Sequence, residues 1–249
     1  MIKRILFFLL LFEFANCYPD REALAQRDDS GSSRSAGGKA RCASYDLTEF
    51  LRTNEDFGVN GVFDTMYQRI QIHFEKIVMD SGEKCTYYIQ GADRLKGVVT
   101  QFSGELKIDK IIEEAGRLPT SNKEIGFRGS YSFSEDRNVE GSGVFKGKFS
   151  ADLSLNNKNK LIDDLALTYG DGFSNFTFDG TWKSYKTGRT KKCTWGQGRL
   201  PNTGDVDQGD GSPVVNEKYL KNGWEWRKGS SKEDYVDNPK FWWRVVSKK

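Results

Sequence analysis

Three aspartates, Asp205, Asp207 and Asp210, lie close together in the glycine-rich stretch TGDVDQGDG. Carboxylate oxygens are the ligands that Ca²⁺ prefers, and glycine allows a loop to fold around an ion. The spacing departs from the usual calcium-loop pattern, because Gly209 occupies the third ligand position. Solvated loop carboxylates are the default for such a cluster, and a calcium site is the functional alternative.

Four of the six tryptophans, Trp224, Trp226, Trp242 and Trp243, lie in the C-terminal stretch after residue 198. Tryptophan combines a large apolar ring with one polar N–H group, so it suits both packing and the stacking of ring-shaped ligands. The ordinary expectation is a cap that closes one end of the fold. The functional alternative is an aromatic platform for a glycan or another ring-faced ligand.

Residues for catalysis are sparse. The chain has a single histidine, His73, which falls on the polar positions of an alternating segment, so we expect it to be exposed on a strand. No phosphate-binding or dinucleotide glycine motif occurs, and no pair of carboxylates stands out for glycoside hydrolysis. The sequence therefore predicts no cofactor and favours a protein that is not an enzyme, with a glycan-active enzyme as an alternative.

The pentapeptide LPNTG at residues 200–204 matches the motif that cell-wall sortases cut. A wall-sorting signal also needs a following hydrophobic stretch that enters the membrane, which takes roughly 20 residues. After Gly204 the longest run without charge is GSPVVN. We therefore interpret LPNTG as a turn, in which Pro201 ends the preceding strand.

The N-terminus, MIKRILFFLLLFEFANC, predicts export. Basic Lys3 and Arg4 precede an apolar run that is too short to span a membrane but is typical of a signal peptide. Cys17 follows closely, as in bacterial lipoprotein signals, so we expect a lipid on Cys17 that anchors the mature chain to the membrane. Cleavage after Cys17, which would release a secreted chain, is the alternative. The next residues, 18–41, have the composition of a flexible linker.

The charge of the chain bears on nucleic-acid binding, and its cysteine content bears on disulfide formation. The net charge is +3 and no block of five basic residues occurs, so the sequence predicts no nucleic-acid partner. Loss of the signal peptide leaves Cys42, Cys85 and Cys193, which in an oxidising compartment predicts one disulfide and one free thiol. The sequence does not select the pair, and Cys85 with Cys193 is the candidate.

From about residue 66 onward, apolar and polar residues alternate with the two-residue period of strands. Ile70, Ile72 and Phe74, for example, alternate with Gln71, His73 and Glu75. Turn signals such as DSGEK, SEDRN and NNKNK separate these runs. The pattern predicts a mainly β fold, an antiparallel meander that forms a small lipocalin- or avidin-like barrel or a β-sandwich. One or two short helices are expected, at YDLTEFLRT and at KIIEEAG.

An outer-membrane barrel also alternates, with its apolar face toward lipid. We favour the barrel or sandwich with an apolar interior, because a Cys17 anchor would be redundant in an outer-membrane barrel. Gly147 and Gly180 fall on apolar faces, where they suit a bend or a close approach of two backbones.

The expected organisation has four parts. A signal peptide at 1–17 and the linker at 18–41 precede the β-meander domain at 42–197. An aromatic-rich extension at 198–249 is expected to pack on the same domain, with a short helix at EKYLKNGW and a last strand at KFWWRVV.

The run GTWKSYKTGRTKKCTWGQGRLPNTGDVDQGDG, followed by NEKYLKNGW, resembles a family of exported bacterial β-rich proteins of lipoprotein type that carries no assigned activity. The resemblance covers the C-terminal half of the chain and implies location and fold only. It also implies a common framework of Trp182, Tyr185, Lys192, Cys193, Trp195, Arg199, Pro201 and Asp207.

These features together predict an exported protein of the cell envelope, either an outer-membrane lipoprotein or a secreted chain. The expected function is binding, with a glycan or a small apolar molecule as ligand, or interaction with another protein. The alternatives are a purely structural envelope protein and, less favoured, a glycan-active enzyme.

Overall fold

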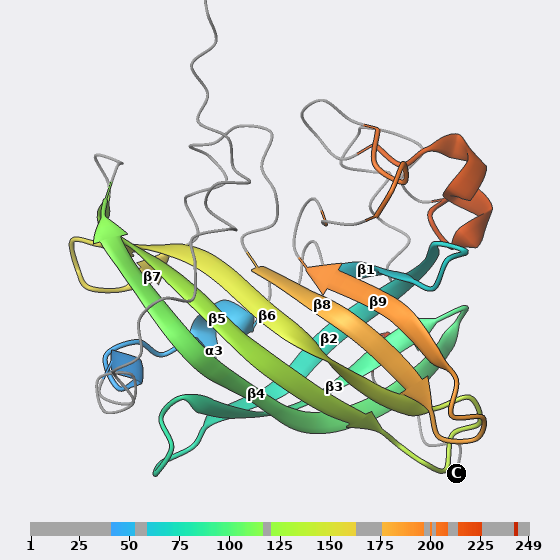
Figure 1. Cartoon of the computed structure of the whole chain (residues 1–249), viewed down its shortest axis with the longest axis horizontal. Coiled ribbons are helices and arrows are strands. Elements are labelled where there is room, and N and C mark those ends of the chain that lie inside the picture. The colour runs from blue at the N-terminus through green and yellow to red at the C-terminus, as the bar shows by residue number, and fades with distance from the viewer. Residues whose placement is uncertain are drawn as a thin grey trace, which may run out of the picture. The chain divides into compact units, whose positions relative to one another are not determined.

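The computed structural model describes residues 41–52, 59–116, 121–162, 176–196, 200, 203–208, 214–225 and 242–243. All of them belong to the second of the two units into which the chain divides, Ser35–Lys249. They form one antiparallel sheet that curves into a ring-like barrel, with only a few short helices (Figure 1). Within these ranges, no helix has both the length and the apolar composition needed to cross a membrane.

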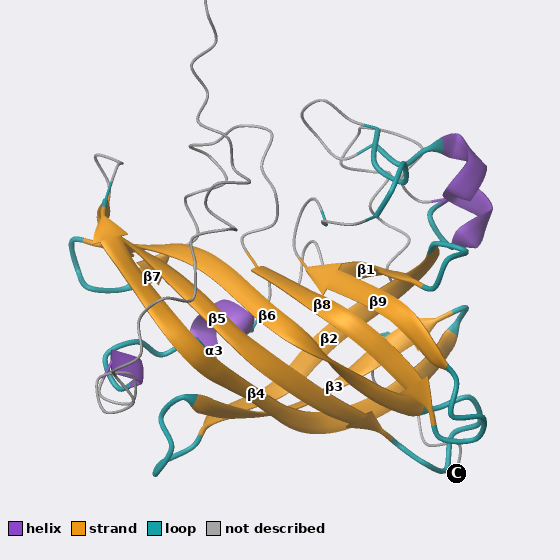
Figure 2. Ribbon diagram, viewed as in Figure 1, coloured by secondary structure: helices purple, strands orange, loops and turns teal. Residues whose placement is uncertain are grey.

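Nine strands make up the sheet (Figure 2). They are β1 (Val59–Phe63), β2 (Gln68–Met79), β3 (Thr86–Leu95), β4 (Val98–Ala115), β5 (Ser121–Glu135), β6 (Gly143–Asn156), β7 (Leu161–Ile162), β8 (Phe176–Ser184) and β9 (Thr190–Gly196). Strands β1 to β6 follow one another as a meander, β8 pairs with β6, and β9 pairs with β1. Eight strands therefore close into a ring, and the short β7 extends the sheet beside the end of β6.

The alternation along each strand directs apolar side chains into the ring. Phe145, Phe149, Phe178 and Trp195 are each at most 1% exposed, and their rings pack against one another. The rings of Phe178 and Trp195, for example, are stacked with centroids 5.5 Å apart. The predicted mainly β fold is confirmed, as a barrel-like ring whose interior is a packed aromatic core.

Gly147 and Gly180 face each other across β6 and β8 on the interior side of the ring. A Cβ atom on Gly180 would lie 2.1 Å from the backbone oxygen of Lys146 and 2.6 Å from the Cα of Gly147. The predicted close approach of two backbones is confirmed. Only glycine fits where the backbones of these two paired strands lie so close together.

Substitution of Gly180 by alanine is expected to lower the free energy of unfolding by about 1–3 kcal/mol, because the added methyl group forces the two strands apart. Gly82 is the matched control, since a Cβ atom there would meet its nearest neighbour at an ordinary 3.5 Å. Urea unfolding of both variants measures the difference. Equal stability of Gly180→Ala and the unmodified chain would contradict the close approach.

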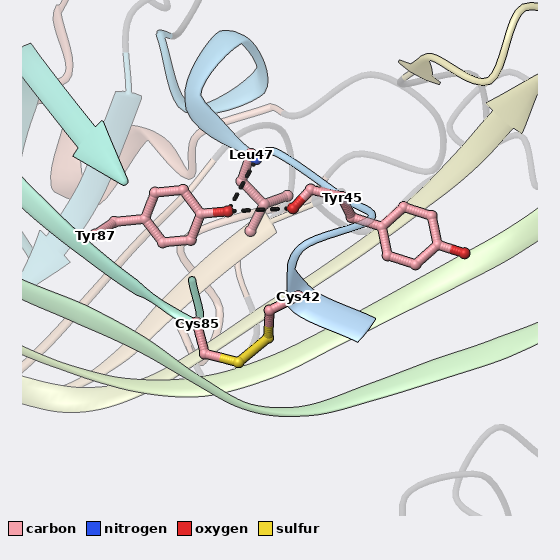
Figure 3. The surroundings of a disulfide bond; sticks show 5 residues. All are labelled: Cys42, Tyr45, Leu47, Cys85 and Tyr87. Atoms are coloured by element: carbon pink, nitrogen blue, oxygen red, sulfur yellow. Dashed lines mark hydrogen bonds between the residues drawn. A yellow bond between two sulfur atoms is a disulfide. The ribbon is translucent and has the colours of Figure 1, made fainter. Parts of the chain in front are cut away.

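A short segment before β1 is bound to the ring by covalent and polar contacts (Figure 3). Cys42 forms a disulfide with Cys85, and the backbone N–H of Leu47 donates to the Tyr87 hydroxyl at 3.1 Å. The same hydroxyl donates to the backbone oxygen of Tyr45 at 3.4 Å. The helix α3 (Thr48–Leu51) follows, and both Leu47 and Leu51 are fully buried in the main core.

The predicted Cys85–Cys193 disulfide is wrong. Cys85 lies where β3 begins, at the β2–β3 end of the ring, and its Cα is 5.2 Å from that of Cys42. Cys193 lies in β9 near the opposite, β8–β9 end, where it is a free and buried cysteine. Its side chain faces the interior opposite Phe63 and Gly180.

Two of the predicted helices are present. Helix α3 lies within YDLTEFLRT, and the 3₁₀ helix η1 (Glu217–Asn222) ends at Gly223 with a left-handed φ of 93°. The helix expected at KIIEEAG is wrong, because a bulge after Ile108 lets β4 continue through this stretch in register with β5. Within KFWWRVV, Trp242 and Trp243 form a turn instead of a strand.

Candidate functional site

A groove of about 430 Å³ opens on the outer face of the ring, across β4, β5, β6 and β8. Strand register brings its residues together. Arg128, Ser150 and Thr177 form one row across three strands. Lys148 and Asp179 are paired two residues farther along β6 and β8, on the same face. Its polar lining residues are Asp109, Arg128, Lys148, Ser150, Thr177 and Asp179. None of these positions was singled out from the sequence as a ligand site.

Several groups that line the groove are held in place. Arg128 Nη1 lies 2.8 Å from Asp152 Oδ1 and also donates to the backbone oxygen of Ala151 at 3.1 Å. Asp179 Oδ1 accepts a hydrogen bond from the Thr194 hydroxyl at 2.5 Å. Lys148, in contrast, is exposed. The groove thus combines fixed hydrogen-bonding groups with the exposed ammonium group of Lys148, which suits a polar ligand such as a glycan.

The interior contains a second group of polar residues, at the β3–β4 end of the ring. Asp93 is 2% exposed, and its carboxyl lies beside that of Glu135. Glu135 Oε2 accepts from Trp182 Nε1 at 2.6 Å and from the backbone N–H of Gly143 at 2.5 Å. Burial, and then the neighbouring Glu135, raise the pKa of Asp93 well above its usual range, and burial also raises the pKa of Glu135.

The raised pKa values indicate that this acid pair holds at least one proton where isolated acids would be ionised. Cys193 lies near the pair, and its thiol pKa is raised by burial and by the two carboxyls, so the thiol stays protonated and unreactive. The pair connects β3, β5, β6 and β8 inside the ring. Its position argues for a structural and pH-sensing role more than for binding.

Sequence inspection missed both acids, although a signal was present. Asp93 has the same parity as Tyr87 and Ile89, and Glu135 has the same parity as Tyr131 and Phe133, so the alternation places both acids on the apolar face. A carboxyl at an apolar position of two different strands indicates a buried polar pair.

Among the described residues, no group of histidine, cysteine, aspartate or glutamate side chains is placed to hold a metal ion. Asp205 pairs with Lys218 and accepts from the Tyr219 hydroxyl at 2.7 Å. Asp207 accepts from the backbone N–H of Val214 at 3.0 Å. Asp210 lies outside the described residues, so calcium stays a prediction. Asp205 therefore contacts η1 directly, whereas Asp207 contacts Val214, which precedes the helix.

The described tryptophans of the C-terminal stretch, Trp224, Trp242 and Trp243, do not share one surface. Trp224 is 5% exposed in a small second core with Val62, Val206 and Val215, on the outer side of β1. Its Nε1 donates to the backbone oxygen of Tyr67 at 3.0 Å. Trp224 is therefore a buried packing residue, and it does not present an exposed ring to a platform. Trp226 lies outside the described residues.

Trp242 and Trp243 lie on the outer face of β2, β3 and β4. The Trp243 ring stacks on His73 with centroids 3.7 Å apart, and its backbone oxygen accepts from Gln101 Nε2 at 2.9 Å. The Trp242 ring lies 5.1 Å from the Arg94 guanidinium. His73 is on the polar face as predicted, but the stacked tryptophan half-buries it. This burial lowers the pKa of His73.

Substitution of Trp243 by alanine is expected to raise the pKa of His73 toward its ordinary value, because water then reaches the imidazole. The chain has one histidine, so its ring protons can be followed by NMR without ambiguity in a protein purified without a histidine tag. Tyr219→Phe, in the second core, is the control that should leave the titration unchanged. An unchanged titration in Trp243→Ala would contradict the stacking.

Cys17, the predicted lipidation site, lies outside the described residues. Comparisons with protein-family models, with curated proteins and with solved structures found no match to this chain.

Proposed function

We propose that this chain is an exported, non-catalytic binding module of the cell envelope that holds a glycan on the outer face of its ring. The observation that carries the proposal is the polar groove across β4, β5, β6 and β8. Its volume falls in the range of ligand sites, and its lining offers the hydroxyl, carboxylate and cationic groups that bind sugar hydroxyls.

The packed interior favours the outer face over the inside of the ring. A barrel that carries an apolar ligand keeps its interior open, whereas here aromatic side chains and the segment from Cys42 to Leu51 occupy it. A polar ligand on the outside is therefore favoured over the small apolar ligand.

The proposal also includes export and a lipid on Cys17. These would present the ring outside the cell, where envelope glycans lie. The support is the N-terminal sequence alone, in which a basic start, an apolar run and Cys17 follow one another. The intact mass of the mature chain tests this part. The mass of a chain that begins at a diacylated Cys17 supports the anchor, and retention of the first 16 residues contradicts export.

Binding of the full chain to immobilised dextran, chitin oligosaccharides and alginate tests the glycan part. We expect saturable binding to at least one of them, and binding about tenfold weaker for Lys148→Ala combined with Ser150→Ala, which removes two polar groups from the groove. Lys76→Ala is the matched control, because Lys76 is also an exposed lysine but lies on β2.

Two results would contradict the proposal. One is the absence of saturable binding to every polysaccharide. The other is equal binding by the groove variant and the unmodified chain, which would place the ligand elsewhere on the surface.

A further inference from the structure

Three exposed lysines gather on the outer face of β6, β8 and β9, beside the groove. Lys146 and Lys192 flank Thr181 on either side in strand register, and Lys183 lies two residues farther along β8 on the same face. Adjacent strands are about 4.8 Å apart, so the backbones of Lys146 and Lys192 are separated by about 10 Å. All three ammonium groups can therefore reach one point above the Thr181 hydroxyl.

The three lysines differ from their neighbours in having no acidic partner among the described residues. Lys186 and Lys191, on the same β8–β9 hairpin, pair with Glu140 at 3.1 Å and with Asp64 at 2.8 Å. Within the described ranges, no such ion pair is formed by Lys146, Lys183 or Lys192. Their separations are close to the screening length at physiological salt, about 8 Å, so their mutual repulsion is only partly screened.

The two acids nearest to the three lysines in the sheet offset only part of their positive charge. Asp179, two residues before Thr181, accepts the hydrogen bond from Thr194. Glu105 is separated from Lys146 by the intervening Ser132 of β5. Lys148 adds a further positive charge two residues from Lys146, where the cluster meets the groove.

We propose that Lys146, Lys183 and Lys192 form the anion-binding part of the glycan site, so that the glycan carries sulfate, phosphate or carboxylate groups. This inference rests on the proposed function and adds the chemical class of the ligand. A negative group above Thr181 relieves the repulsion among the three lysines and accepts hydrogen bonds from ammonium and hydroxyl groups.

An anionic polysaccharide fits this face better than an anionic membrane. Membrane-bound faces add apolar side chains that enter the lipid. The large apolar side chains that are exposed in the described part of the chain, Met66, Val78, Tyr88, Val98 and Val214, all lie outside β6, β8 and β9. The lysines alternate instead with Thr181 and Thr190, whose hydroxyl groups suit sugars.

Dextran sulfate and dextran share one sugar backbone and differ in charge, so they separate charge recognition from sugar recognition. We expect the full chain to bind dextran sulfate at least about tenfold more tightly than dextran. K146Q/K183Q/K192Q is expected to remove this preference. The control K76Q/K158Q/K221Q removes the same charge from exposed lysines elsewhere and is expected to keep it.

Each outcome of this comparison is decisive. Equal binding of dextran and dextran sulfate overturns the inference and leaves the proposed function intact, whereas failure of every polysaccharide overturns both. Equal losses in the two triple variants show an effect of net charge alone and overturn the inference. Tighter binding to phosphatidylglycerol vesicles than to dextran sulfate, lost in K146Q/K183Q/K192Q, overturns it in favour of a membrane surface.

Discussion

The double variant Cys42→Ser and Cys85→Ser is expected to lose about 4 kcal/mol of folding free energy, because the disulfide closes a loop between residues 43 apart in the unfolded chain. The loss also weakens the attachment of Leu47 and Leu51, which the disulfide holds in the main core. Urea unfolding with both the midpoint and the slope measured gives the free energy.

Two comparisons isolate the disulfide in this experiment. Cys193→Ala removes the free thiol and keeps the disulfide, so exchange between thiols cannot contribute to its result. The unmodified chain in a reductant should unfold like the double variant. A loss below about 1 kcal/mol in the double variant would show that packing alone holds the segment, since native disulfides contribute about 2–5 kcal/mol in small secreted domains.

The contribution of the interior acid pair to stability is expected to fall as the pH rises above about 4, the ordinary pKa of a carboxylic acid. Asp93 and Glu135 both have raised pKa values in the folded chain, so the folded chain binds more protons than the unfolded chain above that pH. Each additional bound proton makes the free energy of unfolding decrease by about 1.4 kcal/mol per pH unit, until the folded-state pKa is reached.

Asp93→Asn is expected to flatten this dependence. The amide stays neutral at every pH and, like a protonated carboxyl, can donate a hydrogen bond, so the variant gains stability over the unmodified chain as the pH rises. Urea unfolding at a series of pH values measures both slopes. Glu140→Gln, which removes an exposed carboxylate paired with Lys186, should keep the original slope. Identical slopes for Asp93→Asn and the unmodified chain would show that the acid pair is not protonated.

The strands could be predicted because each contains its own signal. Apolar residues such as Phe145 and Phe149 recur on one face of the strand. Gly147 between them indicates a close approach of backbones even when its partner strand is unknown. The continuation of β4 through Lys110–Ala115 was missed, because a bulge after Ile108 breaks the two-residue period and imitates a helical pattern.

The candidate site could not be predicted, because it depends on register between strands. Arg128, Ser150 and Thr177 are each ordinary polar residues of a strand, and only the pairing of β5, β6 and β8 brings them into one row. The contact between His73 and Trp243 has the same cause, since nothing in the local sequence of either residue indicates the other.

Closure of the ring by β1 and β9 has a consequence for the order of folding. Asn60 of β1 must pair with Gly196 of β9, and the other seven strands lie between them in the sequence. Pairing between residues so far apart in sequence makes folding slow. Until it forms, Cys193 is not yet enclosed and competes with Cys42 and Cys85 for oxidation. During synthesis Cys42 and Cys85 both emerge before β9, so early oxidation excludes disulfides to Cys193 and late oxidation admits them. An oxidant that acts on the growing chain therefore favours the correct fold.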